Sequence, residues 1–135
     1  MRVVLDANVL IAAFAARGLC EAILALCLAN DDLFVTSGIL ADVRSKLSRK
    51  LRMPTGQVDD IVTFLLSYCQ VIDPAGVPQG TCRDSDDHDV LGAAAAAQAD
   101  FLITGNEDLI VLKKYRRTRI VTPRQYWEDF SKRRT

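Results

Sequence analysis

Two patterns of hydrophobic positions alternate along the chain: short unbroken apolar runs, and longer segments in which apolar residues recur every three or four positions. The short runs are typical of buried strands, and they fall at 3–5, 33–36, 70–72, 101–104 and 119–121. The longer segments are typical of helices, and they cover 19–28, 39–47, 55–66, 85–98, 107–112 and a last helix from 123 onward. Because strands and helices alternate, the pattern predicts an α/β fold, a three-layer α/β/α arrangement around a central parallel sheet of about five strands.

Local signals predict several boundaries of these elements. Thr36 offers an N-cap to the helix that follows the second strand, and Ser85 or Asp84 offers one to the alanine-rich helix. The polar residues Asp6 and Asn8 interrupt the first apolar run, which predicts a short strand followed by a turn.

Length and composition narrow the class of protein. With 135 residues, half of them hydrophobic and a quarter charged, the chain is expected to form a single globular domain over 1–135. No apolar stretch approaches the roughly 20 residues of a membrane span, and the first residues lack the pattern of a secretion signal. These features predict a soluble, cytoplasmic protein with no membrane association.

The cysteines and the lone histidine argue against two kinds of site. The chain contains four cysteines, Cys20, Cys27, Cys69 and Cys82. None of them forms a Cys-x-x-Cys pair, which argues against a structural zinc site. Since His88 is the one histidine, the sequence offers little to activate a serine or cysteine nucleophile.

Charge is unevenly distributed although the net charge is zero. Residues 111–135 hold nine Lys or Arg and two acidic residues, a balance of +7, which leaves −7 on residues 1–110. A second basic cluster follows the second predicted strand and comprises Arg44, Lys46, Arg49, Lys50 and Arg52. Basic surfaces beside an acidic site suit a polyanion, because cations can bind its backbone while its phosphate meets a metal ion. The alternative is a solvated helix face and, for the last residues, a frayed tail.

Polar and acidic residues follow two of the predicted strands. Asp6 and Asn8 come directly after the first strand, and Asn106 and Asp108 follow the fourth. Open parallel sheets bind ligands in the crevice beyond the carboxyl ends of their strands, so we expect these residues to share one site. Oxygen-rich sites of this kind bind Mg²⁺ or Mn²⁺. The alternative is that each aspartate only forms a turn or caps a helix.

Two further acids are expected to reach the same crevice. Asp42 lies in the first turns of the helix after the second strand, and Asp87 belongs to an acidic segment, 84–89, with four aspartates among six residues. One or two acids are enough to complement a helix N-terminus, and four exceed that need. Crowded carboxylates repel one another unless a cation lies between them, so the cluster favours a divalent-metal site that activates water against a phosphodiester.

Four short motifs occur in a fixed order along the chain. They are Leu5-Asp6-Ala7-Asn8-Val9-Leu10, the segment 35–43, Arg83-Asp84-Ser85-Asp86-Asp87, and the segment 99–109 with its Thr104-Gly105-Asn106-Glu107-Asp108. Their order and spacing resemble those of the PIN domain family, and the closing segment 120–123 also fits. The similarity spans nearly the whole chain and is greatest to the prokaryotic branch of toxin components of toxin–antitoxin pairs.

The resemblance implies a PIN-like fold and a ribonuclease that depends on Mg²⁺ or Mn²⁺. It implies RNA as substrate, a cognate antitoxin protein as partner, and a homodimer. The residues expected to be catalytic are Asp6, Asp42, Asp87 and Asn106. The residues expected to bind the metal ion are Asp6, Asp87, Asp42 and Asp108. The residues expected to support the site are Asn8, Thr104 and Asp84. From the basic clusters, the residues expected to contact RNA are Arg44, Lys46, Lys113 and Lys114.

Two positions depart from the family pattern. Asp42 stands where the family has a glutamate, one methylene longer, and Asn106 stands where the motif Thr-Gly-Asp-x-Asp has its first aspartate. The second departure removes one negative charge from the site. Both keep open a second function, a PIN-like module that binds RNA or a protein partner without cutting. A third hypothesis, a phospho-accepting receiver-like domain, shares the fold type, but the chain lacks an acidic pair after the first strand and a lysine after the fifth.

Apolar residues of the last two predicted helices bear on assembly. They are Leu109, Tyr126, Trp127 and Phe130. We expect them to form an exposed apolar surface beside basic residues, which favours a homodimer. The alternative is that Trp127 and Phe130 close the underside of the sheet.

Overall fold

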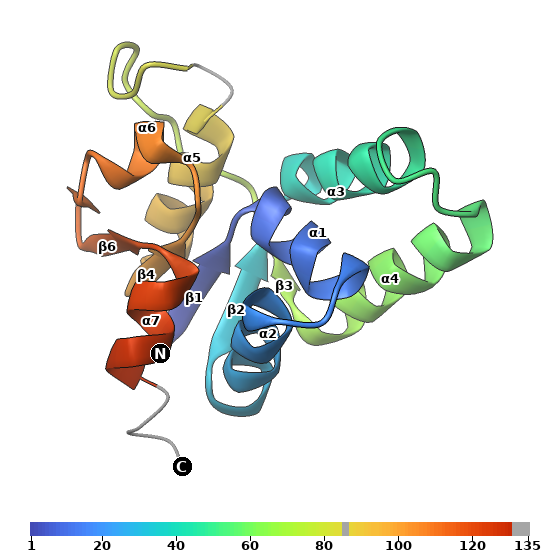
Figure 1. The fold of residues 1–135 in the computed structure, drawn as a ribbon. Coiled ribbons are helices and arrows are strands. Elements are labelled where there is room, and N and C mark those ends of the chain that lie inside the picture. Colours follow the sequence, from blue (N-terminus) through green and yellow to red (C-terminus); the bar gives the residue numbers. More distant parts are fainter. Residues whose placement is uncertain (85–86, 131–135) are drawn as a thin grey trace.

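The computed structural model describes residues 1–84 and 87–130. Ser85 as a helix cap, Asp86 in the acidic segment, and the basic tail at 131–135 therefore lie outside the described residues. Within them the chain forms a six-stranded sheet flanked by helices (Figure 1).

The strands and helices follow one another in nearly regular alternation. The strands are β1 (Arg2–Leu5), β2 (Asp32–Val35), β3 (Gln70–Val71), β4 (Phe101–Ile103), β5 (Lys114–Tyr115) and β6 (Thr118–Val121). The helices are α1 (Ala7–Ala15), α2 (Leu19–Asn30), α3 (Ser37–Arg49), α4 (Thr55–Tyr68), α5 (His88–Ala97), α6 (Glu107–Ile110) and α7 (Pro123–Phe130).

The strand order in the sheet is β3-β2-β1-β4-β6-β5. The central strand β1 pairs in parallel with β2 on one side and with β4 on the other, and Val4 lies opposite both Phe34 and Leu102. The predicted α/β class with a mainly parallel sheet is confirmed, and the first and fourth strands, β1 and β4, are neighbours. From β1 the chain adds β2 and β3 on one side of the sheet, and it then returns to add β4 and β6 on the other side. The carboxyl ends of β1 and β4 therefore form the switch point at which open α/β sheets bind ligands.

One strand was not predicted. β5 is two residues long, runs antiparallel to β6, and lies at the edge of the sheet. Its residues, Lys114 and Tyr115, form no apolar run. An edge strand does not need two buried faces, and its charge and short length protect it from pairing with other chains.

One helix was also missed. Residues 7–15 form α1 immediately after β1, where the sequence predicted a turn. The side chain of Asp6 accepts a hydrogen bond from the backbone N–H of Val9 at 2.8 Å and caps the helix. Asp6, the polar residue that follows β1, is therefore also the N-cap of α1.

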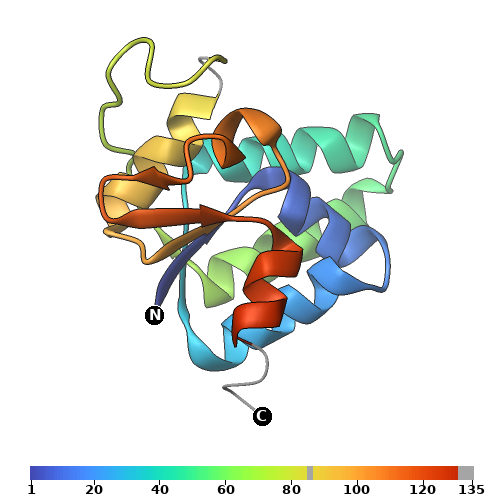
Figure 2. The same cartoon turned by 60° about the vertical axis from the view of Figure 1, so that its left-hand side comes forward.

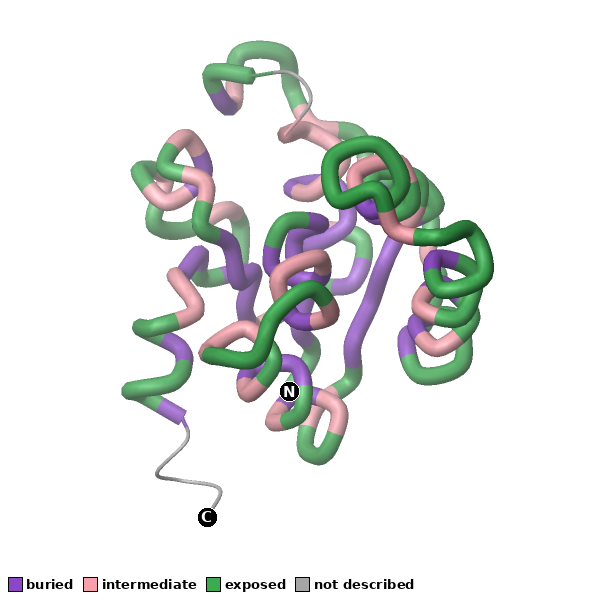
Figure 3. The backbone as a smooth tube through the Cα atoms, turned by 45° about the vertical axis from the view of Figure 1, so that its right-hand side comes forward, coloured by how far each residue is buried: buried purple, intermediate pink, exposed green. Residues whose placement is uncertain are grey.

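The helices cover both faces of the sheet (Figures 1 and 2). Parallel strands are joined by right-handed crossovers, so the return of the chain from β3 to β4 places α5 on the face opposite the helices of the first half. There α5 packs against β1 and β2, while α7 packs against α2. The strands β1, β2 and β4 are buried along most of their length, as the tube in Figure 3 shows.

α5 begins later than the sequence predicted. Its first residue is His88, and Asp84, one of the two expected caps, lies outside the helix. Asp87 occupies the N-cap position with an αR backbone and makes no capping hydrogen bond through its side chain. The side chain of Asp87 is therefore available for contacts outside the helix.

The expectation of an exposed aromatic surface was wrong for three of its four residues. Leu109, Tyr126 and Phe130 are buried, and only Trp127 is partly exposed, at 38%. Tyr126 and Phe130 stack on one another and meet Phe101 of β4 edge to face. The alternative, closure of the sheet by the last helix, is correct for Phe130, because α7 turns these two rings against β4.

No single helix in the described part of the chain is long and apolar enough to cross a membrane. Among the helices of residues 1–84 and 87–130, only α1 and α2 taken together reach that length and composition, across a bend of 107°.

Candidate active site

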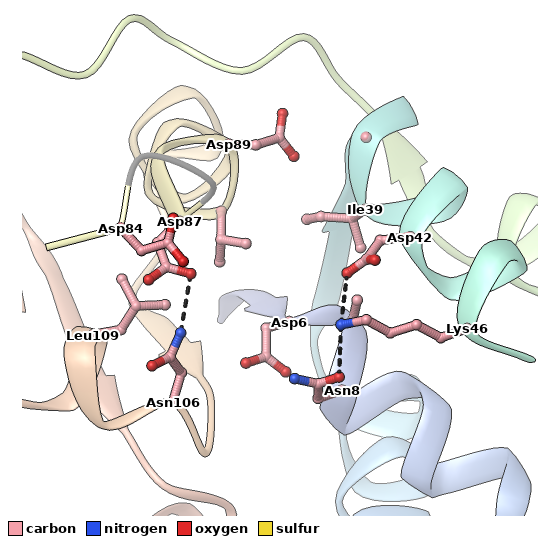
Figure 4. Close-up of a pocket in the computed structure, with 13 residues that line it drawn as sticks. Asp6, Asn8, Ile39, Asp42, Lys46, Asp84, Asp87, Asp89, Asn106 and Leu109 are labelled. Atoms are coloured by element: carbon pink, nitrogen blue, oxygen red, sulfur yellow. Dashed lines mark hydrogen bonds and ion pairs between the residues drawn. The ribbon is translucent and has the colours of Figure 1, made fainter. Parts of the chain in front are cut away.

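A cavity of about 510 Å³ opens where the carboxyl ends of β1 and β4 meet (Figure 4). The N-terminus of α1, helix α3, the residues around the start of α5 and the residues around the start of α6 all contribute to its walls. The polar residues that line it are Asp6, Asn8, Asp42, Lys46, Asp84, Asp87, Asp89 and Asn106. Three segments that are far apart in sequence thus bring five aspartates to one cavity, and a fourth segment contributes Asn106.

Asp6 is fixed from two sides. One carboxylate oxygen caps α1, and the other accepts a hydrogen bond from the hydroxyl of Thr104, which is fully buried at the end of β4. Burial raises the pKa of Asp6 above its ordinary value of 3.8, and the hydrogen bonds from Thr104 and Val9 and the charge of Lys46 lower the pKa back in part. Thr104, which was expected to support the site, holds the carboxylate of Asp6 through this hydrogen bond.

Asp87 and Asn106 form a pair across the cavity wall. The side-chain amide Nδ2 of Asn106 donates a hydrogen bond to Oδ1 of Asp87 at 3.0 Å. The other oxygen, Oδ2, is buried and has no hydrogen-bond partner among the described residues. Burial raises the pKa of Asp87 most, Asn106 lowers it, and the negative charges of nearby aspartates, Asp84 foremost, raise it further.

Both ends of the Asn106 amide are in use. Its oxygen accepts a hydrogen bond from the backbone N–H of Asp108 at 3.0 Å and caps α6. Its backbone N–H donates to the hydroxyl of Thr104, also at 3.0 Å. Asn106 thus links the Asp6–Thr104 pair to Asp87, and in this arrangement its oxygen is directed to a helix end.

The opposite wall carries Asp42 and Lys46, one turn apart on α3. The ammonium of Lys46 lies 3.2 Å from Oδ2 of Asp42 and donates a hydrogen bond to Oδ1 of Asn8 at 3.1 Å. The side chain of Asp42 is about half exposed and that of Lys46 about a quarter. Lys46, expected from its charge to contact RNA, is therefore a part of the cavity itself (Figure 4).

Asp89 is a cavity residue that the sequence reasoning did not select. Its Oδ2 accepts a hydrogen bond from the hydroxyl of Thr36 at 2.8 Å, and Thr36 in turn caps α3. Gly38 leaves room for this carboxylate, because a Cβ at that position would come within 2.8 Å of Oδ2. The available signal was the acidic segment itself, in which Asp89 follows Asp87 by two residues.

Several predicted site residues lie outside the cavity walls. Asp108 is near enough for its charge to raise the pKa of Asp87, but its own carboxylate faces Arg83, with 4.0 Å between Oδ1 and Nη1. Arg44 points away and pairs with Asp59 at 2.7 Å. The two predicted lysines at the far edge of the sheet, Lys113 and Lys114, are exposed and do not line the cavity.

Comparisons with known proteins agree with this arrangement. A family model of the PIN domain matches residues 2–108, about four fifths of the chain. The chain belongs to the PIN domain family. PIN domains are typically nucleases, and they generally depend on divalent metal ions.

A solved structure has the same PIN fold. It is the crystal structure of VapBC2 from Rickettsia felis bound to a DNA fragment from their promoter. The matched chain is 19% identical, with a TM-score of 0.64, and the match covers 90% of this chain and 98% of that one. At this identity the likeness concerns the fold. No curated protein sequence matches the chain.

The donor groups of this PIN domain fit a hard divalent cation. Carboxylate and amide oxygens predominate among the polar groups in the cavity, and these are the ligands that Mg²⁺ and Mn²⁺ prefer. Oδ2 of Asp87, which has no hydrogen-bond partner among the described residues, is an oxygen to which such a cation could bind. Within residues 1–84 and 87–130, however, no three His, Cys, Asp or Glu side chains are arranged to hold an ion together. The carboxylates share a cavity but lie on opposite walls, so joint coordination requires side chains to move.

Proposed function

We propose that this PIN domain is a metal-dependent endoribonuclease that hydrolyses RNA phosphodiester bonds. The observation that carries the proposal is the convergence of aspartates on one cavity at the switch point of the sheet, from the end of β1, from α3 and from the segment that leads into α5. A metal-free protein gains nothing in stability from gathering like charges in this way. The arrangement suits a site that binds a divalent cation together with a phosphate group of RNA.

Asp6 and Asp87 are the proposed principal ligands of a Mg²⁺ or Mn²⁺ ion, and Asp42 is proposed to complete the set from the opposite wall. Asp108 is a weaker candidate than the sequence suggested, because its carboxylate faces Arg83. When bound, the ion supplies positive charge that stabilises the phosphoryl transition state and lowers the pKa of an attacking water.

The remaining residues have positioning roles in this proposal. Thr104 and the N-terminus of α1 hold Asp6 in one orientation. Asn106 holds one oxygen of Asp87 and leaves the other without a partner among the described residues. Asp84 adds negative charge beside Asp87, and Asn8 holds Lys46. The basic residues Arg44, Lys113 and Lys114 are proposed to contact RNA outside the cavity, through phosphates and without reading sequence.

The test is cleavage of single-stranded RNA by the purified protein in Mn²⁺ or Mg²⁺, and in EDTA. We expect cleavage with metal ions only, and a loss of about two orders of magnitude or more in Asp87→Asn, since a metal ligand is removed. Asp60→Asn is the matched control, because Asp60 is an exposed acid on α4 outside the cavity. Cleavage that persists in Asp87→Asn, or in EDTA, would contradict the proposed mechanism.

For biological role we propose the toxin of a toxin–antitoxin pair. The support is the similarity of the sequence motifs to that branch, together with the matched fold of VapBC2. Expression of the chain alone is then expected to arrest growth, and co-expression with a short neighbouring gene for a DNA-binding antitoxin is expected to restore it. An Asp87→Asn chain that still arrests growth would separate toxicity from the proposed chemistry.

A second function is favoured by two observations. The Asn106 amide is engaged at both ends, and no three acids among the described residues are arranged to hold an ion. These features suit a PIN domain that binds RNA or a protein partner without cutting. The two functions are distinguished by RNA binding measured beside cleavage: binding without metal-dependent cleavage supports the second.

A further inference from the structure

Lys46 is the one lysine or arginine that lines the acidic cavity, as far as the described residues show. Its side chain extends from α3 toward the N-terminus of α1, where it meets Asn8 (Figure 4). Its ammonium lies 3.2 Å from Asp42 and 3.1 Å from the oxygen of Asn8. A cation is thus already present among the carboxylates, and it is part of the chain.

The position of Lys46 is set by helical spacing. Asp42 and Lys46 are four residues apart on α3, so their side chains lie over adjacent turns and meet without distortion of the backbone. The side chain of Asp42 is about half exposed, and an exposed pair of this kind adds little to stability. Its effect is local: it neutralises Asp42 and turns one of that carboxylate's oxygens toward the ammonium.

The charge of Lys46 also reaches the other wall. It acts on Asp6, the buried aspartate at the end of β1, and partly offsets the rise in pKa that burial causes there. The same ammonium therefore compensates negative charge from both sides of the cavity.

We propose that Lys46 is a resident counter-cation of the site, and that a divalent metal ion binds in competition with its contacts to Asp42 and Asn8. This inference rests on the proposed function, since it assigns a role toward the metal ion of that same cavity. Its contact with Asp42 directs that carboxylate toward the α3 side of the cavity, so a metal ion must compete with the lysine for it.

The competition has a measurable direction. Removing the ammonium makes the cavity more negative and releases Asp42, so metal affinity rises. We expect the dissociation constant for Mn²⁺ to fall about three- to tenfold in Lys46→Met, since a unit positive charge is removed from the partly solvated cavity in which the ion would bind. Lys46→Arg keeps the charge and is expected to bind Mn²⁺ close to the level of the parent protein.

The experiment is calorimetric titration of the full chain with MnCl₂ at fixed ionic strength. Lys50→Met is the matched control, because Lys50 ends the same helix, is exposed, and lies outside the cavity. It removes the same charge and is expected to leave the Mn²⁺ affinity unchanged. Thermal melts give a second readout: Lys46→Met should show a larger Mn²⁺-induced rise in Tm than the parent, because tighter binding to the native state stabilises it more.

Each outcome bears on the proposal. Equal affinity in the parent and Lys46→Met, or weaker affinity in the variant, overturns the role of Lys46 as a competitor and leaves the proposed nuclease function standing. Absence of Mn²⁺ binding in every protein overturns both. If Lys46→Met binds Mn²⁺ more tightly but the parent does not cleave RNA, the proposed role of Lys46 is supported and the proposed nuclease function is wrong.

Discussion

Asp6 shows how one residue combines a structural and a functional requirement. Its carboxylate caps α1 and accepts a hydrogen bond from the Thr104 hydroxyl. The residue is buried, with 5% of its surface exposed. Burial raises its pKa above 3.8, so the folded state binds this proton more tightly than the unfolded state does. The stability that follows is fully present below pH 3.8 and is lost as pH rises through the raised pKa. At neutral pH, without metal, the charged carboxylate of Asp6 therefore carries a cost in free energy.

Replacing Asp6 by asparagine removes that cost. Asparagine caps helices as well as aspartate does, so we expect Asp6→Asn to fold and, without metal at neutral pH, to melt a few degrees higher than the parent. The gain should shrink as the pH falls through the raised pKa of Asp6, because the parent carboxyl then takes up its proton. Thermal melts across this pH range measure both effects. If the exposed control Asp60→Asn shows an equal rise in melting temperature, the rise comes from the change in net charge and the prediction is wrong.

Asn106 permits the opposite change. In Asn106→Asp the hydrogen bond to Asp87 becomes a contact between two carboxylates, while an aspartate can still cap α6. We expect the metal-free variant to lose about 1–3 kcal/mol of stability, because a favourable hydrogen bond is replaced by like-charge repulsion. Added Mn²⁺ should restore this loss, with tighter metal binding than in the parent and faster cleavage at low Mg²⁺. Chemical unfolding with and without Mn²⁺ tests the prediction. If the free energy of unfolding of Asn106→Asp is the same with and without Mn²⁺, Asn106 lies outside the metal site.

At the scale of elements, the packing of α5 depends on a glycine. Gly92 lies where α5 crosses the segment after β3, and a Cβ there would come within 2.4 Å of the carbonyl oxygen of Ala75. That carbonyl belongs to the backbone and cannot turn aside, and the N–H of Ala75 donates to the carbonyl of Gly92. We expect Gly92→Ala to cost roughly 1–3 kcal/mol, since the helix must move away from the segment that holds Ala75.

Two other glycines serve as comparisons for Gly92→Ala. Gly56 in α4 has open space around its missing Cβ, so Gly56→Ala should stabilise the protein by up to about 1 kcal/mol through helix propensity. Gly38 faces the end of the Asp89 side chain, which can rotate, so Gly38→Ala should cost less than Gly92→Ala. Urea unfolding of the three variants gives the order directly. A Gly92→Ala protein as stable as Gly56→Ala would contradict the close packing of α5.

At the scale of the whole molecule, assembly remains a proposal. Burial of Tyr126 and Phe130 removes the aromatic surface that first favoured a homodimer. Other large apolar side chains are exposed among the described residues, including Leu66, Tyr68 and Val71 near the β3 edge of the sheet. Exposed apolar area of this kind favours self-association. We expect sedimentation at micromolar concentration to give twice the chain mass of 14.9 kDa, and a sharp monomer peak would show that the homodimer expectation is wrong.

The sequence by itself determined the order of most elements and the residues at the ends of the central strands. These properties depend on near neighbours: apolar periodicity selects strand or helix, and a polar side chain such as Thr36 or Asp6 caps the helix that follows it. The sequence motifs also led to the PIN domain family. The same local rules failed at α1 and β5, where a cap was interpreted as a turn and a charged edge strand offered no apolar run.

Only the tertiary structure decided which side chains meet. The strand order brings Asp6 beside Asn106, and the crossovers on the two faces bring Asp87 and Asp42 to the same cavity from opposite walls. The pairing of Lys46 with Asn8, the contact of Asp89 with Thr36, and the burial of Tyr126 follow from the same arrangement. These contacts join residues distant in sequence, and their geometry is fixed by the packing of whole elements, so no local pattern could have specified them.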